Sequence, residues 1–262
     1  MSSTSPFTIL FVQGSWHVPA HAEPLTASFK ALDIECIAPL LPSNNVSNSN
    51  QDPSSLPDAH VDSACVQEHL ERLVTQQQRN VLLVAHSYGG LVATMAAHES
   101  FSLRNRSAKS QVGGLLGIFY VCTFSAPVGA VPMAYYGHTG SGTKIEGGII
   151  SCPEPETLLF NDLDPEAAKH WSSLLVPQSV SVHYTACDYA GYEHVPCGYL
   201  YGKNDRCITE EIRERLLKLV KDRDGEVKIW YCDAGHEPQI SWTEGLRDVL
   251  VGFAKDCLSQ FD

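Results

Sequence analysis

The sequence predicts a single α/β domain with a mostly parallel sheet that is flanked by helices. Six short apolar runs alternate with segments whose apolar residues recur at helical spacing, which is the pattern of consecutive βαβ units. The chain has 262 residues, enough for one large α/β domain, and its content of 44% hydrophobic and 18% charged residues is typical of a protein that buries a core. Global disorder is therefore excluded.

The expected strands are short apolar runs that end at turn-forming residues. The clearest is Asn80–Ala85, and the first, Phe7–Val12, is followed by Gly14 and a loop rich in proline and histidine. Continuous apolar runs of this length are typical of strands that are buried on both faces. The sequence predicts strands at residues 7–12, 34–37, 80–85, 115–121, 197–201 and 226–231.

Helices are expected between these strands. In residues 62–79, Val66, Leu70 and Leu73 recur at helical spacing, and Asp62 is the expected N-cap. Further helices are predicted at residues 91–98, 209–221 and 241–257.

Residues 125–190 interrupt the alternation of strands and helices. They are rich in glycine, proline and aromatic residues, and their one clear helix, residues 164–175, has Asp164 as its cap and Pro165 in its first turn. We expect an inserted cap, or lid, that folds over one edge of the sheet. The core domain is then formed by residues 1–124 and 191–262.

Charge and cysteine content exclude several classes of protein. The formal net charge of -12 argues against binding to nucleic acid or to anionic membranes. No apolar run approaches the ~18 residues that span a bilayer, and the N-terminus lacks the basic stretch of a secretory signal, so a cytoplasmic location is expected. The 9 cysteines form no Cys-x-x-Cys pair and no His-Glu-x-x-His motif occurs, so neither disulfides nor a metal or other cofactor is expected.

The most informative stretch is Ala85-His-Ser87-Tyr-Gly89-Gly, which lies between a predicted strand and a predicted helix. A serine at such a turn needs small neighbours because the strand and helix backbones come very close, and Ala85 and Gly89 supply them. The N-terminus of the helix also offers a positive dipole end where an oxyanion would form. We predict Ser87 as a nucleophile, and the alternative is a structural serine in a tight turn.

Several blocks along most of the chain resemble the α/β-hydrolase superfamily, in particular its small cap-bearing microbial esterase-like members. The turn around Ser87 and the block Ala234-Gly-His236 are the specific ones, although Ala85 replaces the first glycine of the usual Gly-x-Ser-x-Gly pattern. Plant methyl esterases and hydroxynitrile lyases are similar by the same motifs, more distantly. Weaker resemblance is carried by residues 12–19, 113–124, 160–165 and 199–205.

The resemblance implies a catalytic triad whose members follow in the order Ser, acid, His. His236 follows the last predicted strand, and Asp205 follows the strand before it, where the family places the acid. Asp233 leaves the same strand as His236, so those two side chains cannot readily face each other. The alternatives are an ordinary structural histidine and a loop aspartate that caps the next helix.

The resemblance also implies an oxyanion hole made of backbone N–H groups. The expected donors are Tyr88 and Ser15, with Trp16 as the second choice for the latter. We expect Glu237, directly after His236, either to raise the pKa of that histidine or to face solvent. The side chains expected to line the substrate site, unless they pack as core instead, are Trp16, His86, Phe124, Tyr136 and Trp171.

The predicted activity is hydrolysis of a small carboxylic ester, lactone or thioester through an acyl-enzyme on Ser87. A natural-product thioesterase or macrolactone-forming cyclase would use the same triad with a substrate hydroxyl as acceptor. A lyase similar to hydroxynitrile lyases is a third alternative, but such lyases carry Thr at the position of Gly14 and Lys at that of Glu237. A non-catalytic ligand receptor is the fourth, but receptors on this fold often lack a triad residue, whereas all three are present here. Expected partners are a small-molecule substrate, free or attached to a carrier, and the chain is expected to be a monomer or homodimer.

Overall fold

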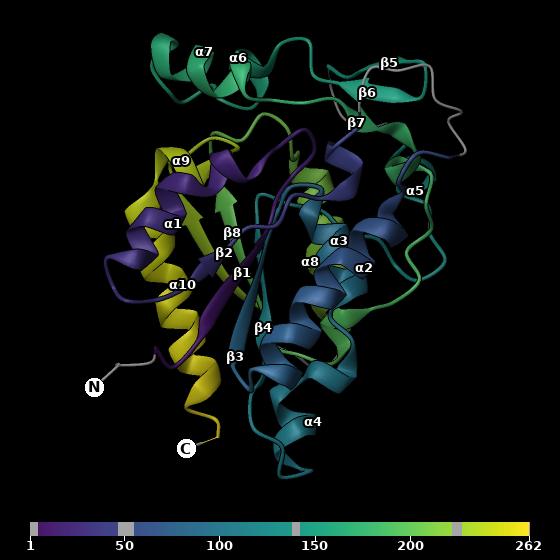
Figure 1. The fold of residues 1–262 in the computed structure, drawn as a ribbon. Helices are drawn as coiled ribbons and strands as arrows, with labels where there is room; N and C mark the ends of the chain where they lie inside the picture. The colour runs from purple at the N-terminus through teal and green to yellow at the C-terminus, as the bar shows by residue number, and fades with distance from the viewer. Residues whose placement is uncertain (1–4, 47–54, 138–141, 222–226, 262) are drawn as a thin grey trace.

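The computed structural model describes residues 5–46, 55–137, 142–221 and 227–261. At its centre is a six-stranded, parallel sheet in the order β2-β1-β3-β4-β8-β9 (Figure 1). The predicted α/β class, with a parallel sheet flanked by helices, is confirmed. The last strand was predicted from residue 226, which lies outside the described residues. The six strands are β1 (Thr8–Val12), β2 (Cys36–Ile37), β3 (Asn80–His86), β4 (Gly114–Val121), β8 (Cys197–Gly202) and β9 (Lys228–Cys232).

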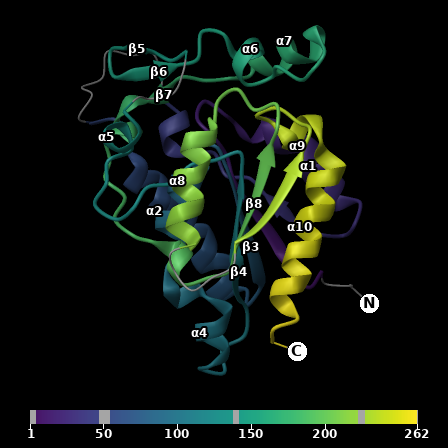
Figure 2. The same ribbon diagram turned by 180° about the vertical axis from the view of Figure 1, so that it is seen from behind.

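The central strands bury both of their faces. Leu10 and Leu83 belong to one apolar cluster, whereas Ile9 and Leu82 belong to the other, because successive strand residues point to opposite sides of the sheet. This double burial explains why these strands appear in the sequence as continuous apolar runs. One face is covered by α2 (Ala59–Leu70), α3 (Gly89–Ala96) and α8 (Glu210–Lys221), and the other by α1 (Glu23–Lys30) and α10 (Thr243–Leu258) (Figures 1 and 2).

The helix predicted over residues 62–79 begins earlier than expected. Asp58, rather than Asp62, is the N-cap of α2, because its side chain accepts the backbone amides of His60 and Val61 at 3.0 and 3.1 Å. The helix continues into a π-helical segment, Glu71–Gln76. Asp62 is therefore not a capping residue, and its side chain is fully buried.

Residues 125–190, which we call the cap segment, include a small sheet and two helices that lie across the carboxyl ends of the parallel strands (Figures 1 and 2). The segment contains a small antiparallel sheet in the order β5-β6-β7. Its clearest helix starts after Asp164, as predicted, since that side chain accepts two backbone amides of the first turn. The elements are α5 (Pro132–Tyr136), β5 (Lys144–Glu146), β6 (Ile149–Ser151), α6 (Pro155–Leu158), α7 (Pro165–Ser173) and β7 (Gln178–Ser179).

Short helices complete the connections. All nine cysteines carry free thiols, and five of them are buried. Within the described ranges, no helix combines the length and the apolar character that crossing a bilayer requires. The remaining helices are α4 (Leu103–Ser107), α9 (Pro238–Ser241) and the 3-10 helices Pro19–Ala22, Pro42–Asn44, Glu99–Phe101, Val180–His183 and Gly191–Glu193.

The start of α3 packs directly on the loop after β1, which predicts a large cost for any side chain there. A Cβ on Gly89 would collide with the carbonyl oxygen of Val12, whereas a Cβ on Gly252 in α10 would meet nothing within 4 Å. We expect Gly89→Ala to lower the free energy of unfolding by about 1–3 kcal/mol through overpacking. Gly252→Ala, the matched control, should raise it by about 0.5–1 kcal/mol. Urea unfolding measures both, and equal stabilities would contradict the prediction.

Candidate active site

Ser87 occupies the sharp turn between β3 and α3. Its φ of +52° lies in the left-handed region, where strain of about 1–3 kcal/mol is typical of a residue other than glycine. The loop after β1 packs against this turn so closely that a Cβ on Gly14 would lie 2.8 Å from the Ser87 Cβ. The small residues around the serine are therefore required by the approach of two backbones.

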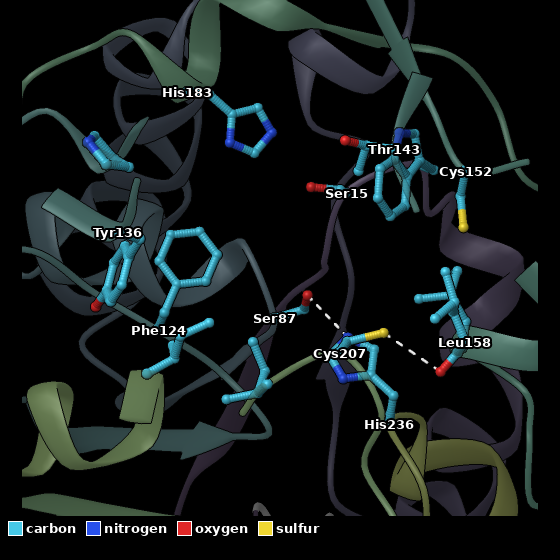
Figure 3. Close-up of a pocket in the computed structure, with 15 residues that line it drawn as sticks. Ser15, Ser87, Phe124, Tyr136, Thr143, Cys152, Leu158, His183, Cys207 and His236 are labelled. Atoms are coloured by element: carbon cyan, nitrogen blue, oxygen red, sulfur yellow. Dashed lines mark hydrogen bonds between the residues drawn. The ribbon is translucent and has the colours of Figure 1, made fainter. Parts of the chain in front are cut away.

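The imidazole of His236 connects Ser87 to Asp205. Its Nε2 lies 3.0 Å from the Ser87 Oγ (Figure 3), and its Nδ1 lies 3.0 Å from each carboxylate oxygen of Asp205. Because a carboxylate only accepts hydrogen bonds, Nδ1 carries the proton and Nε2 is left to accept the Ser87 hydroxyl. The structure thus brings together the three residues that the sequence predicted as a triad, from loops that follow three different strands.

Asp205 is held in place by further hydrogen bonds. Its Oδ1 accepts the backbone amides of Cys207 and Ile208 at 2.7 and 3.0 Å. These bonds hold the loop after β8 and do not cap α8, which begins at Glu210, where Thr209 accepts the Ile212 amide at 3.4 Å instead. Asp233, by contrast, is exposed and forms an ion pair with Lys203 at 2.7 Å.

The electrostatic surroundings favour a protonated His236. Burial is the largest single influence and lowers the pKa of this imidazole, but the charge and hydrogen bond of Asp205 together with the Glu237 and Asp162 carboxylates outweigh it, so that the pKa lies above its ordinary value. A raised pKa strengthens the histidine as a proton acceptor from Ser87.

Glu237 is completely buried beside His236, so it does not face solvent. Its Oε1 lies 3.1 Å from Nε2 of His17, and its Oε2 lies 3.6 Å from Nε2 of His86. The Nδ1 of His17 lies 2.6 Å from the Ser15 carbonyl oxygen on its other side. Although burial raises the pKa of Glu237, the two neighbouring histidines bring that pKa well below its ordinary value. The buried carboxylate thus lies between two histidines that favour its ionised form.

A buried asparagine holds the loop after β1. The Nδ2 of Asn44 donates to the carbonyls of Gly14 and His17 at 3.0 Å, and its Oδ1 accepts the amide of Trp16 at 3.0 Å. In a trans peptide the C=O and N–H point in opposite directions, so the hydrogen bond to the Gly14 carbonyl also sets the direction of the Ser15 N–H. Since the Trp16 amide is committed to Asn44, Ser15 is the better placed of the two donors considered on this loop.

Asp62 connects the segment that carries Asn44 to the turn at Ser87. Its carboxylate accepts the amide and the hydroxyl of Ser43 at 2.9 and 2.5 Å, and the hydroxyl of Tyr88 at 2.8 Å. Burial raises the pKa of Asp62 above its ordinary value, while these hydrogen bonds counteract the increase. The sequence analysis missed both Asn44 and Asp62. An acid four residues before Val66, on the buried face of a helix, was the one available signal.

The triad opens into a cavity beneath the cap segment. Of the side chains predicted to line the substrate site, Trp16, Phe124 and Tyr136 do line this cavity, together with Ser15 (Figure 3). Other lining residues come from the cap segment and from the region after β8, and no sequence pattern marks them. They include Cys152, Leu158, His183, Cys207, Ile208 and Ile212.

Two of the predicted lining residues lie elsewhere. His86 is fully buried, stacks on Phe11 and places its Nε2 2.9 Å from the His236 carbonyl oxygen, so it cannot touch a substrate. Burial lowers the pKa of His86 to about 4 and keeps it neutral. Trp171 packs on His21, with the ring centroids 5.9 Å apart, and does not border the cavity.

Trp16 joins the loop after β1 to the cap segment. Its indole Nε1 donates to the Ile150 carbonyl in β6 at 3.0 Å, and its own carbonyl accepts the Val176 amide at 2.9 Å. Its φ of +68° is again in the left-handed region. The residue beside the predicted oxyanion donor is thus fixed from both sides.

Two clusters of side chains bring metal-ligating atoms within 4.8 Å of one another. One contains two residues of the triad, whose ligand atoms are committed to the hydrogen bonds described above. The other is the buried acid with the two histidines that lie against it. The clusters are Asp205, Cys207 and His236, and His17, His86 and Glu237.

The electrostatic effect of Glu237 on His236, the predicted general base, predicts a change with pH. The Glu237 carboxylate stabilises the imidazolium form of His236, so Glu237→Gln should lower the pKa of His236 and move the acidic limb of the kcat/KM profile to lower pH. Asp233→Asn, three residues before His236, removes an exposed charge that solvent screens, and should leave the limb in place. Coincident profiles for the parent and Glu237→Gln would contradict the prediction.

The hydrogen bonds of Asn44 predict a role in catalysis through the Ser15 peptide. Asn44→Ala should lower kcat by about 10- to 100-fold with little change in KM, somewhat less than the loss of an oxyanion donor itself. Asn44→Asp should be no better, since a carboxylate cannot donate to the two carbonyls. The neighbouring Asn45 is exposed, and Asn45→Ala is the matched control. A boronic acid that adds to Ser87 mimics the tetrahedral oxyanion, so its affinity should fall together with kcat/KM. A fall in kcat/KM with unchanged affinity for the boronic acid would contradict the assignment.

The chain is similar in sequence to one probable hydrolase and in structure to several solved proteins. A probable hydrolase from Phoma sp. is 26% identical over 260 residues, which covers 96% of this chain and 99% of that protein. A pyrethroid hydrolase from Sphingobium faniae matches the structure with a TM-score of 0.74 at 16% identity, covering 95% of this chain and 97% of the other. A methylesterase from Arabidopsis gives 0.68 at 17% identity, with 94% and 97% coverage. Tomato methylketone synthase I gives 0.72 at 12% identity, with 97% and 99% coverage.

The solved structures share so little sequence with this chain that their similarity concerns the fold. The family itself is shown by sequence, because the model of the alpha/beta hydrolase family matches residues 9–249, which is most of the chain. The resemblance inferred from the turn at Ser87 and the block at His236 is confirmed, and the chain belongs to the alpha/beta hydrolase family.

Proposed function

We propose that the chain is a serine hydrolase that cleaves a small carboxylic ester, lactone or thioester through an acyl-enzyme on Ser87. The observation that carries this proposal is the continuous hydrogen-bonded series from the Ser87 hydroxyl through His236 to Asp205, at the wall of a cavity. A serine with only a structural role in the turn would not need a histidine that is itself oriented by a buried carboxylate.

In the first half-reaction, His236 Nε2 takes the proton of Ser87 as its Oγ attacks the carbonyl carbon. The tetrahedral oxyanion is received by the backbone N–H groups of Tyr88 and Ser15. Collapse breaks the bond to the leaving group, which takes the proton from His236 and departs as an alcohol or thiol. In the second half-reaction, water gives a proton to His236 and attacks the acyl carbon, and Ser87 is released with its proton restored.

The lining of the cavity supports an uncharged, largely apolar substrate. Among the described residues that line it, none is a lysine or an arginine, and Phe124, Leu158 and Ile212 are apolar. A substrate with a free carboxylate would lose its hydration there without gaining a cationic partner. Two of the proteins with a similar structure, a pyrethroid hydrolase and a methylesterase, are likewise hydrolytic enzymes that act on esters.

The two positions that separate this chain from lyases with similar motifs support hydrolysis. A Cβ on Gly14 would lie 2.8 Å from the Ser87 Cβ and 3.3 Å from its Oγ, so a threonine side chain does not fit there without a shift of the turn. Glu237 is fully buried against His17, where a lysine would bury an ammonium group in place of a carboxylate.

The proposal predicts a single reactive serine. Intact mass after incubation with a fluorophosphonate should show one adduct on the parent protein and none on Ser87→Ala. His236→Ala should form the same adduct more slowly. On 4-nitrophenyl esters, Ser87→Ala should lower kcat/KM by about 1,000-fold or more.

The products of the same reactions separate hydrolysis from acyl transfer. Release of the free acid supports hydrolysis, whereas a lactone or a new ester as the main product would favour transfer to a hydroxyl. A folded parent protein that forms no adduct and cleaves no ester would overturn the proposal.

A further inference from the structure

A histidine of the cap segment faces the catalytic cavity without a part in the triad. His183 ends the 3-10 helix Val180–His183, and its side chain borders the same cavity as Ser87. Figure 3 shows its ring projecting into the space between Phe124 and Ser15. The ring also lies near Tyr88, with 6.5 Å between the two ring centroids.

His183 is buried and lacks a hydrogen-bond partner. The residue is 6% exposed, and its Nε2 has no partner anywhere in the described part of the chain. Burial lowers the pKa of His183 to about 4, so the ring is neutral near pH 7 and offers one N–H donor and one lone-pair acceptor. A buried polar group without a partner is costly, and such groups in native proteins usually find one.

The neighbouring side chains do not supply that partner. The hydroxyl of Tyr136 donates to the Ser125 carbonyl, and its ring packs edge-on against Phe124 with 5.5 Å between centroids. The side chains of Tyr136 and Phe124 therefore present ring atoms rather than hydrogen-bonding groups on this side of the cavity. A molecule in the cavity, whether water or a bound substrate, can supply that partner.

We propose that His183 is a specificity-determining residue that forms a hydrogen bond with a second, uncharged oxygen function of the substrate, away from the carbonyl that Ser87 attacks. This inference rests on the proposed function and narrows it to esters that carry a ketone, hydroxyl or ether oxygen. A free carboxylate is the wrong ligand, because the imidazole is neutral and the described lining has no lysine or arginine to balance the charge.

The test compares matched pairs of substrates on matched variants. One series is 4-nitrophenyl hexanoate with its 3-oxo, 4-oxo and 5-oxo analogues, and the other is phenyl acetate with its hydroxy and methoxy analogues. In the parent, at least one oxygenated ester should exceed its hydrocarbon counterpart in kcat/KM by about 3- to 10-fold, as one hydrogen bond between neutral groups would give.

Three variants then assign the preference to the imidazole. His183→Leu should bring the ratio to about 1 while changing the plain ester less than about two-fold, and His183→Gln, which keeps a donor and an acceptor, should retain part of the preference. His60→Leu, at an exposed histidine, is the control and should keep the full ratio. In the Ser87→Ala background, equilibrium binding of the preferred ester should weaken by the same factor with His183→Leu.

Two results would overturn the inference. One is a parent that prefers no oxygenated ester in either series. The other is a folded His183→Leu variant, checked by thermal unfolding, in which the plain and oxygenated esters lose activity equally, because this would show a structural role alone. Failure of the proposed function itself is distinguishable, since it would appear as a parent that forms no fluorophosphonate adduct and cleaves no ester.

Discussion

The close packing of the loop after β1 against the turn that carries Ser87 is the constraint on which the rest of the site depends. Gly14 and Gly89 leave no room for a Cβ between the two backbones, and Ser87 is held in the left-handed region. Such strain persists only where the surroundings over-determine the conformation. Here the Ser87 amide donates to the Val121 carbonyl at 3.3 Å and its carbonyl accepts the Gly90 amide at 3.0 Å, so both the central sheet and α3 hold the turn.

Two buried carboxylates join the loops that meet at this turn. Glu237 connects the histidine loop to His17, and Asp62 connects α2 to Ser43 and Tyr88. Burying a carboxylate is unfavourable unless it finds polar partners. Glu237 lies against His17 and accepts the side-chain amide of Gln239, and Asp62 accepts hydrogen bonds from Ser43 and Tyr88. Apolar contacts are non-directional, whereas these hydrogen bonds have fixed geometry, so they determine how the loops lie relative to one another.

The sequence was sufficient for those parts of the structure that are encoded locally. Apolar runs marked the strands, and small residues on both sides of Ser87 marked the turn. Asn44 and Asp62 were missed because their roles depend on contacts with residues 30 and 26 positions away, respectively. His86 was placed wrongly because adjacency to the nucleophile says nothing about direction, and a side chain at the end of a strand can point away from its neighbour. The environment of Glu237, fully buried beside His17, was likewise beyond a local pattern.

The hydrogen bonds of Trp16 tie the cap segment to the loop after β1. The hydrogen bond between the Trp16 indole and the Ile150 carbonyl links β6 to the residue directly after Ser15. The position of the cap segment and the direction of the Ser15 N–H, the predicted oxyanion donor, are therefore coupled through a single residue.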